Sequence, residues 1–268
     1  MTLYKFSGAG NDFVVLDGRA GGVERYREVP VIQELCGKYG TDGLMILDKG
    51  GSYDFSMEFF NPDGTGGMMC GNGGRCIVAF ADSLGIRPSE GPVYRFLAPD
   101  GLHTGEILSR NGDREWTVKL GMIDVDGFRE YPEGLFLNTG TRHLVVFSDD
   151  VDKVDVEACG PVLRHDARFA PEGTNVNFVS VHPDGLHVRT FEKGVEGETL
   201  ACGTGITASA IAAYIRGVEP SLRDADAVSY DVTARRGDRL AVAFRPWNHT
   251  FTGVYLTGPA ELIPVPDL

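Results

Sequence analysis

An internal repeat is the feature of this sequence that most restricts its fold. The letters CGNG occupy residues 70–73, and CGTG occupy residues 202–205. Each motif opens an apolar stretch that stops at a glycine, Gly85 in the first copy and Gly217 in the second. Because segments that repeat in this way usually fold alike, we expect two structurally similar halves.

The correspondence extends along the chain in both directions from the cysteine motifs. Residues 10–13 (GNDF) precede the apolar run VVL, and residues 140–143 (GTRH) precede LVV. A turn at Gly101 matches a turn at Gly237. These matches occur in the same order and at nearly constant separation, which is hard to ascribe to chance.

The length of the chain also fits two domains. Its 268 residues exceed the ~100–200 residues that are usual for one domain. We predict an N-terminal half over residues 1–120 and a C-terminal half over residues 121–256. A C-terminal strand at about 257–268 is expected to join the N-terminal half.

Most of the local sequence patterns indicate strands. β-Branched and aromatic residues between Gly, Pro or Asp turns predict strands over residues 14–16, 53–60, 116–120, 144–147, 176–181, 186–191 and 240–244. A helix is predicted over 73–84, with one apolar face made of Ile77, Phe80, Ala81 and Leu84. A second, alanine-rich helix over 205–216 is expected to be buried on most sides. A short amphipathic helix is predicted over 31–38. The predicted fold class is α+β.

Cys70 and Cys202 lie where a thiol is easily ionised. A glycine-rich turn that runs into a helix puts each sulfur at a helix N-terminus, where the macrodipole and backbone N–H groups favour negative charge. The glycines also let the backbone present N–H groups to an anion such as a carboxylate. If the two halves face each other, one thiolate can remove a proton from a carbon while the opposing thiol protonates its other face. We therefore predict that Cys70 and Cys202 form a catalytic pair that inverts a stereocentre.

Composition narrows the other possibilities. Cys36, Cys76 and Cys159 have no matched partner and are expected to be small buried hydrophobic residues. An odd total of five cysteines without a C-x-x-C pair argues against a disulfide framework and a zinc site, so we expect no metal. A net charge of −13 disfavours nucleic acid as a partner. The absence of a ~20-residue apolar run and of a signal-peptide pattern predicts a cytoplasmic protein without membrane association.

Five segments together carry a resemblance to a known family, and they span nearly the whole chain: residues 10–13 (GNDF), 60–64 (FNPDG), 70–76 (CGNGGRC), 174–178 (TNVNF) and 198–205 (ETLACGTG). In these segments the sequence resembles diaminopimelate epimerase, an amino-acid epimerase that works without pyridoxal phosphate. The resemblance implies two pseudo-symmetric domains, each a mostly antiparallel, barrel-like sheet around a central helix. It also implies conversion of LL-2,6-diaminopimelate to the meso isomer in lysine and peptidoglycan biosynthesis, no cofactor, and a homodimer.

The same resemblance implies roles for individual residues. Cys70 and Cys202 would be the base–acid pair, and His143 and Glu192 would tune them. The reacting carboxylate would be held by the backbone of Gly71, Asn72, Gly203 and Thr204. The distal end of the amino-acid substrate would be held by side chains from both halves: Asn11, Asn61, Asn175, Glu192 and Lys193, with Thr141 and Arg142 as further substrate-binding candidates.

Four positions depart from the family pattern on the substrate-binding side. Thr141 and Arg142 precede the histidine where the family usually has Asn or Ser and then Pro. Gly43 replaces a frequent glutamine, and Lys193 replaces an arginine. Lysine lacks the planar fork that binds a carboxylate bidentately. Either Arg142 supplies the lost guanidinium, or the specificity has moved to a different distal group. A solvated surface charge at Arg142 and a near-neutral replacement at Lys193 stay open.

Three alternative functions remain at this point. A pyridoxal-phosphate-independent racemase of another amino acid would use the same thiol pair and differ only in its substrate profile. A non-catalytic amino-acid-binding protein would keep its affinity when both cysteines are replaced by serine. A redox sensor would join the two cysteines in a disulfide, which leaves no thiolate to act as a base.

Overall fold

The computed structural model describes residues 1–67 and 69–265, and the chain divides into two compact units. Unit 1 comprises Met1–Leu120 and Gly258–Leu268, and unit 2 comprises Gly121–Thr257. The C-terminal strand expected at about 257–268 ends in residues 266–268, which lie outside the described residues. The observed last strand, β18, spans Thr250–Ile263.

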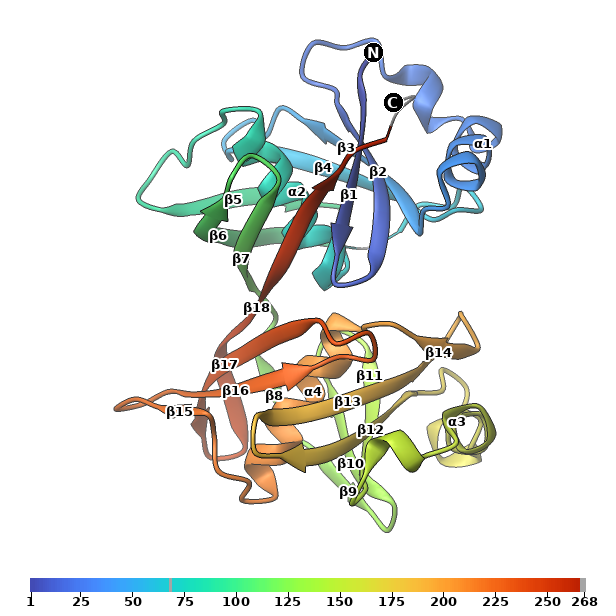
Figure 1. Ribbon diagram of the computed structural model, residues 1–268, viewed down its shortest axis with the longest axis vertical. Coiled ribbons are helices and arrows are strands. Elements are labelled where there is room, and N and C mark those ends of the chain that lie inside the picture. The colour runs from blue at the N-terminus through green and yellow to red at the C-terminus, as the bar shows by residue number, and fades with distance from the viewer. Residues whose placement is uncertain (68, 266–268) are drawn as a thin grey trace. The chain divides into compact units, whose positions relative to one another are not determined.

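In unit 1 the strands close into a barrel (Figure 1). Among the described residues the ring follows chain order: β1 (Leu3–Gly8), β2 (Asn11–Asp17), β3 (Gly43–Asp48), β4 (Phe55–Phe60), β5 (Val93–Ala98), β6 (Gly101–Asn111) and β7 (Glu115–Gly121). The C-terminal part of β18 closes the ring, because it pairs with both β7 and β1. The pairs β2–β3 and β4–β5 are parallel. Every other neighbouring pair in this ring is antiparallel.

Helix α2 (Gly71–Ser83) is the core of unit 1. Every residue from Gly71 to Asp82 is buried, and residues 76–81 are completely covered. The sequence predicted one apolar face, but the barrel surrounds this helix on all sides, and Leu84 follows its last turn as the C-cap. A short 3-10 helix (Glu24–Arg27) leads into α1 (Val29–Tyr39), which packs on the barrel against β2 and β3.

Unit 2 repeats the strand order of unit 1. In the described part of the chain it contains β10 (Gly134–Asn138), β11 (Arg142–Phe147), β12 (Asn175–His182), β13 (Gly185–Glu192), β16 (Val228–Thr233), β17 (Arg239–Trp247), the N-terminal part of β18, and β8 (Val125–Asp126), which pairs with β18. The parallel pairs β11–β12 and β13–β16 stand at the places of β2–β3 and β4–β5. Short strands add to the edges: β9 (Arg129–Tyr131), β14 (Gly197–Thr199) and β15 (Leu222–Arg223).

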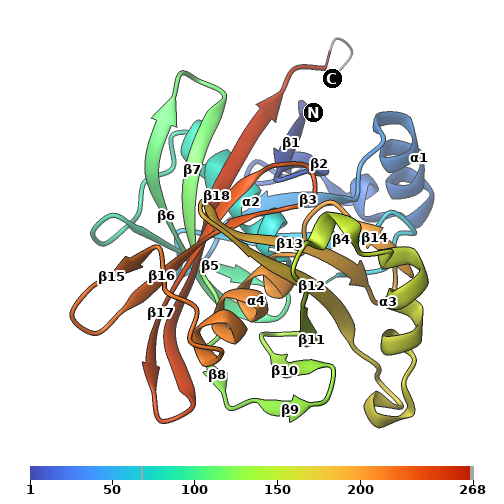
Figure 2. The same ribbon diagram turned by 60° about the horizontal axis from the view of Figure 1, so that its bottom comes forward.

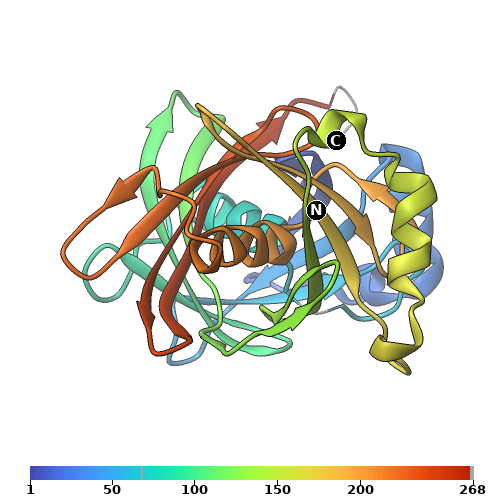
Figure 3. The same ribbon diagram turned by 90° about the horizontal axis from the view of Figure 1, so that it is seen from below.

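Helix α4 (Gly203–Ile215) runs inside the strands of unit 2, as Figure 3 shows. Its side chains are small enough to fit there, and Ala208, Ala210, Ala212 and Ala213 are completely covered. Helix α3 (Val156–Arg164) lies on the outside against β12 and β13 (Figure 2), between 3-10 helices at Val151–Lys153 and Ala167–Phe169. The predicted α+β class, with two similar halves built around central helices, is confirmed.

The starts of the central helices and the exposure of Cys159 also differ from the sequence-based expectation. Both central helices begin two residues earlier than predicted, at the glycine directly after the cysteine, so that each cysteine is the N-cap. Cys159 was expected to be buried, but it is exposed because α3 covers the barrel with its other face. None of the helices in the described ranges is long and apolar enough to cross a membrane.

Candidate active site

Unit 1 holds Cys70 at the start of its central helix. Cys70 is the N-cap of α2, and its Sγ accepts a hydrogen bond from the backbone N–H of Gly73 at 3.2 Å. The thiol thus takes the place that Ser, Thr, Asp or Asn usually fills, where donors and the helix dipole favour negative charge. Gly73 leaves room for this sulfur, because a Cβ there would lie 3.2 Å from it and 3.3 Å from Sδ of Met45.

A buried arginine braces the turn that follows Cys70. Arg75 is completely covered, and it donates to the Oδ1 of Asn72 at 2.8 Å and to the carbonyl of Gly71 at 3.1 Å. The amide of Asn72 in turn donates to the Oδ1 of Asn11. The structure therefore brings Asn11, Asn72 and the Cys70 turn together. Sequence reasoning assigned no role to Arg75, although it lies within the CGNGGRC segment.

The remaining predicted residue of unit 1, Asn61, follows β4, where its amide donates to Oγ1 of Thr65 at 3.0 Å. The Phe59 ring lies close to Gly67 of this loop and to Gly73 in the first turn of α2. Gly43 pairs in β3 beside the same strand, and a Cβ there would lie only 2.8 Å from the carbonyl oxygen of Phe60. A glutamine at position 43 would therefore require the backbone at Phe60 to shift in this structure.

Cys202 occupies the equivalent position in unit 2, with different neighbours. It is the N-cap of α4, and its Sγ lies 3.4 Å from the Oγ1 of Thr204. The Thr204 hydroxyl is 3.0 Å from Nε2 of His143 and 3.0 Å from Oγ1 of Thr141. Thr141 is itself 2.8 Å from the same Nε2. Four residues predicted from the sequence therefore form one hydrogen-bonded cluster.

His143 is neutral in this cluster at neutral pH. Its side chain is completely buried, and burial lowers the pKa of the imidazole to about 3, because the charged form loses its hydration. Its second nitrogen, Nδ1, lies 3.0 Å from the amide nitrogen of Asn177. His143 therefore acts on its neighbours as a neutral hydrogen-bonding group.

Asn175 connects the loop before His143 to the end of β13. Its amide donates to the carbonyl of Arg142 at 2.9 Å, and its Oδ1 accepts from the backbone N–H of Lys193 at 2.8 Å. Arg142 pairs with the Glu172 carboxylate at 2.9 Å, and Nζ of Lys193 donates to the Glu172 carbonyl at 3.1 Å. Two of the residues that depart from the family pattern, Arg142 and Lys193, thus meet at Glu172, which lies in a loop and carries no sequence signal.

Glu192, the last residue of β13, accepts a hydrogen bond from Oγ1 of Thr199 at 2.9 Å. The predicted site residues therefore form two groups, one in each unit. Unit 1 contributes Cys70, Gly71, Asn72, Asn11 and Asn61, and unit 2 contributes Cys202, Gly203, Thr204, Thr141, Arg142, His143, Asn175, Glu192 and Lys193. The described residues contain no group of three or more His, Cys, Asp or Glu side chains that could hold a metal ion.

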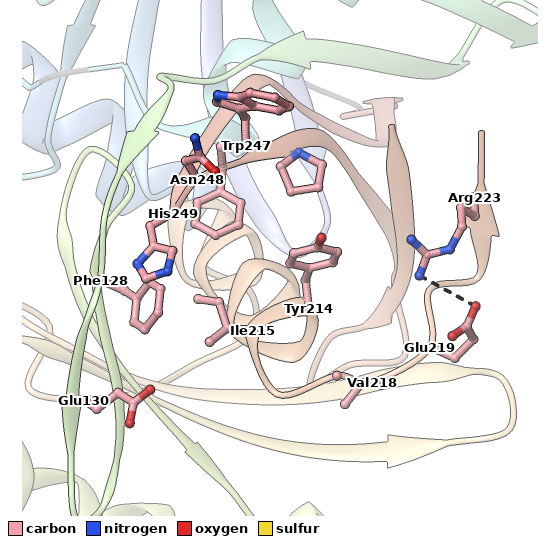
Figure 4. Close-up of a pocket in the computed structure, with 13 residues that line it drawn as sticks. Phe128, Glu130, Tyr214, Ile215, Val218, Glu219, Arg223, Trp247, Asn248 and His249 are labelled. Atoms are coloured by element: carbon pink, nitrogen blue, oxygen red, sulfur yellow. Dashed lines mark ion pairs between the residues drawn. The ribbon is translucent and has the colours of Figure 1, made fainter. Parts of the chain in front are cut away.

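A cavity of about 740 Å³ lies at the opposite end of α4 from Cys202, around Tyr214 and Ile215 (Figure 4). It is lined by Phe128, Trp247 and other side chains of unit 2, and by none of the predicted site residues. In unit 1 the corresponding end of α2 carries Asp82, whose buried carboxylate accepts hydrogen bonds from Trp116, Tyr94 and two arginines: Arg87 and Arg110. The cavity of unit 2 is separate from the cysteine site, because no predicted site residue lines it.

Solved structures share this architecture. A phenazine biosynthesis protein of the PhzF family from Bacillus anthracis aligns with a TM-score of 0.73, 14% identity and coverage of 98% of this chain and 96% of that chain. A hydroxyproline epimerase from Agrobacterium vitis aligns with a TM-score of 0.61, 16% identity and coverage of 98% and 93%. The chain therefore has the same fold as these two solved proteins.

Sequence comparison identifies the family within this fold. The diaminopimelate epimerase family model matches residues 3–113 and 135–263. A diaminopimelate epimerase from Flavobacterium psychrophilum is 39% identical over 98% of both chains, and one from Chlorobaculum tepidum is 39% identical over 96% of this chain and 97% of its own. One from Aquifex aeolicus is 38% identical over 96% and 94%. The chain belongs to the diaminopimelate epimerase family and is an isomerase, which confirms the resemblance.

Proposed function

We propose that this protein is a diaminopimelate epimerase that inverts one α-carbon of LL-2,6-diaminopimelate to give the meso isomer. Cys70 and Cys202 act as its two acid–base groups, and no cofactor takes part. The observation that carries the proposal is the equivalent placement of the two sulfurs, each at the N-cap of the helix inside its own barrel. The names of the relatives, at 39% and 38% identity, favour this substrate over another amino acid.

The proposed reaction needs one thiolate and one thiol on opposite faces of the α-carbon. The thiolate takes the α-proton, and the electron pair of the broken C–H bond delocalises into the adjacent carboxylate. The opposing thiol then gives its proton to the other face of the carbon. One sulfur has gained a proton and the other has lost one, so the product state is ready for the reverse reaction.

Donors at both helix starts would stabilise the charges in this reaction. The first N–H groups of a helix have no acceptor within the helix itself. In our proposal those of Gly71, Asn72, Gly203 and Thr204 hold the reacting carboxylate as it gains enolate character. Removing one such donor from an oxyanion site typically lowers kcat by about 10²–10³-fold. The N–H of Gly73 stabilises the Cys70 thiolate, because it already points at that sulfur.

The distal end of the substrate carries both an ammonium and a carboxylate, and the proposed partners match both charges. The carboxamides of Asn11, Asn61 and Asn175 can donate and accept, and Glu192 supplies a carboxylate for the ammonium. We assign the distal carboxylate to Arg142. Its present ion pair with Glu172 joins two side chains that are 38% and 53% exposed, and such surface pairs are weak, so a substrate carboxylate can replace Glu172 at little cost.

The enzyme is further proposed to act in the cytoplasm, as the sequence pattern predicts, and as a homodimer, as the family resemblance implies. Light scattering after size-exclusion chromatography would report a particle of twice the 29.0 kDa chain mass. A monomer at all concentrations tested would contradict the homodimer but would leave the reaction unaffected.

The decisive experiment is proton NMR of LL-diaminopimelate incubated in D2O with reduced, dialysed protein and no added cofactor. Deuterium should replace one α-proton as the meso isomer forms. Exchange with a different amino acid of a test panel, but not with diaminopimelate, would contradict the substrate and keep the two-thiol chemistry. No exchange with any amino acid would contradict the proposed function altogether.

A further inference from the structure

Asn177 lies against His143 in the interior of unit 2, where sequence reasoning gave it no role. Both side chains are completely buried, and the amide nitrogen of Asn177 is 3.0 Å from Nδ1 of His143. The same nitrogen faces the carbonyl of Leu144 at 3.5 Å, and the Oδ1 of Asn177 accepts from the hydroxyl of Thr190 at 2.9 Å. The amide is therefore held on both of its ends.

These contacts define which way the amide points. The carbonyl of Leu144 can only accept, so the amide atom that faces it must be the NH2 group. Gly205 makes room for the opposite end, since a Cβ at this position would lie 2.2 Å from Oδ1 of Asn177. The NH2 group of Asn177 consequently donates to Nδ1 of His143, and Nδ1 must be unprotonated.

The proton of the neutral imidazole must then sit on Nε2. From Nε2 it can be donated to Oγ1 of Thr141 at 2.8 Å or to Oγ1 of Thr204 at 3.0 Å, and the Thr141 hydroxyl can donate to Oγ1 of Thr204 at 3.0 Å. The hydrogen of the Thr204 hydroxyl then points at Sγ of Cys202, 3.4 Å from the hydroxyl oxygen. A series of hydrogen bonds between neutral groups therefore connects Asn177 to the Cys202 sulfur.

We propose that Asn177 is a positioning residue, which fixes His143 in its Nε2–H tautomer and so aims the Thr204 hydroxyl as a donor at Cys202. The opposite tautomer would make Nε2 an acceptor and draw the hydroxyls of Thr141 and Thr204 toward it. Cys202 would then lose one donor to its thiolate, the Thr204 hydroxyl. This inference deepens the proposed function and rests on it for the catalytic role of Cys202.

The tautomer can be measured directly, without substrate. In 15N-labelled protein the protonated and unprotonated ring nitrogens of histidine resonate far apart, and the signals of His143 are those lost in His143→Gln. We expect unprotonated Nδ1 and protonated Nε2 at pH 7. A ring with its proton on Nδ1 would overturn the proposal.

The variant Asn177→Leu keeps most of the side-chain volume and removes the amide. Because the ring can then move its proton to Nδ1, the pKa of the Cys202 thiol should rise by about one to two units, the size expected for losing a donor to an anion. The pKa is followed by 13Cβ NMR of labelled cysteine, with Cys202→Ser to assign the signal. We expect kcat for α-proton exchange to fall about ten- to hundredfold at pH 7, with little change in KM, and to recover as the pH rises.

Thr190→Val is a milder second variant, because it removes only the hydroxyl that holds Oδ1 of Asn177. It should move the tautomer and the thiol pKa in the same direction by a smaller amount. Ser209→Ala is the matched control: it removes another buried hydroxyl of unit 2, one that donates to the Gly205 carbonyl at 2.7 Å, and should leave both readouts unchanged.

The outcomes separate this inference from the proposed function. An unchanged thiol pKa in both Asn177→Leu and Thr190→Val would overturn the positioning role, whatever the activity. A shift of the same size in Ser209→Ala would overturn it too, since the effect would then reflect general loosening of the unit. Wild-type protein that shows the expected tautomer and thiol titration, but exchanges no α-proton, would instead contradict the proposed function.

Discussion

One added methyl group at Gly205 tests whether the start of α4 is packed as the structure shows. Replacing glycine by alanine within a helix normally stabilises it by about 0.5–1 kcal/mol, because glycine loses more backbone freedom on folding. At Gly205, however, the new Cβ would lie 2.2 Å from Oδ1 of Asn177 and 3.3 Å from Cε1 of His143. Ordinary C···O contacts are about 3.3–3.6 Å. The Asn177 oxygen would therefore have to move by about 1 Å.

The cost of that movement exceeds the gain in helix propensity. Overpacking a buried site by one methyl group costs about 1–3 kcal/mol. Asn177 cannot turn away freely, because Thr190 donates to this oxygen, and an unpaired buried hydroxyl costs about 1–3 kcal/mol more. Less the gain of up to ~1 kcal/mol in helix propensity, Gly205→Ala should destabilise the protein by about 1–5 kcal/mol.

Gly37→Ala is the matched control for this prediction. Gly37 also lies within a helix, α1, but it is exposed and a Cβ there would meet nothing within 4 Å. This variant should stabilise the protein by about 0.5–1 kcal/mol. Urea unfolding followed by circular dichroism should thus give midpoints that move in opposite directions. An increase in the midpoint of Gly205→Ala equal to that of Gly37→Ala would refute the packing described around Asn177.

Three further predictions use the same assays. Cys70→Ala and Cys202→Ala should each abolish epimerisation, because both sulfurs take part in either direction of the reaction. Cys159→Ala, at an exposed position, should keep full activity. An active Cys202→Ala variant would exclude the two-base mechanism. Burial lowers the pKa of His143 from 6.5 to about 3, so its contribution to stability is complete above pH 6.5 and is lost as the pH falls toward 3. The wild type should therefore lose about 2 kcal/mol between pH 7 and pH 5 that His143→Gln does not lose, and equal losses in urea unfolding would contradict this. Arg142→Ala should raise KM for diaminopimelate with little change in kcat. It should change the free energy of unfolding by less than about 1 kcal/mol, because surface ion pairs are weak. An unchanged KM would show that Arg142 does not bind substrate.

The sequence was most informative where structure is encoded locally. The two glycine-rich turns gave the positions of both central helices to within two residues, because a glycine turn followed by an apolar stretch is a local signal. Strand β3 (Gly43–Asp48) was missed. Its burial pattern is nearly continuous, since α2 packs inside the barrel and α1 packs outside it, so the alternation that reveals a half-buried strand is absent.

The site could be predicted as a set of residues but not as a set of contacts. Asn177 and Thr190 come from neighbouring antiparallel strands, and Asn177 reaches His143 only because β12 lies parallel to β11. A single asparagine within an apolar strand carries no local sign of such a partner. Arg75 was likewise within a recognised motif, but its complete burial depends on the closed barrel around α2, which joins distant parts of the chain.

The two sulfurs occupy equivalent positions, but their surroundings can respond to protonation in different ways. A backbone N–H donates to Cys70; it can stabilise a thiolate but cannot accept a hydrogen bond from a thiol. A hydroxyl lies next to Cys202; it can donate to a thiolate and, after turning, accept from a thiol. In the proposed reaction each sulfur is once a thiolate and once a thiol. The energetic difference between these two states of Cys202 should therefore depend on the histidine cluster, so substitutions in that cluster should change the titration of Cys202.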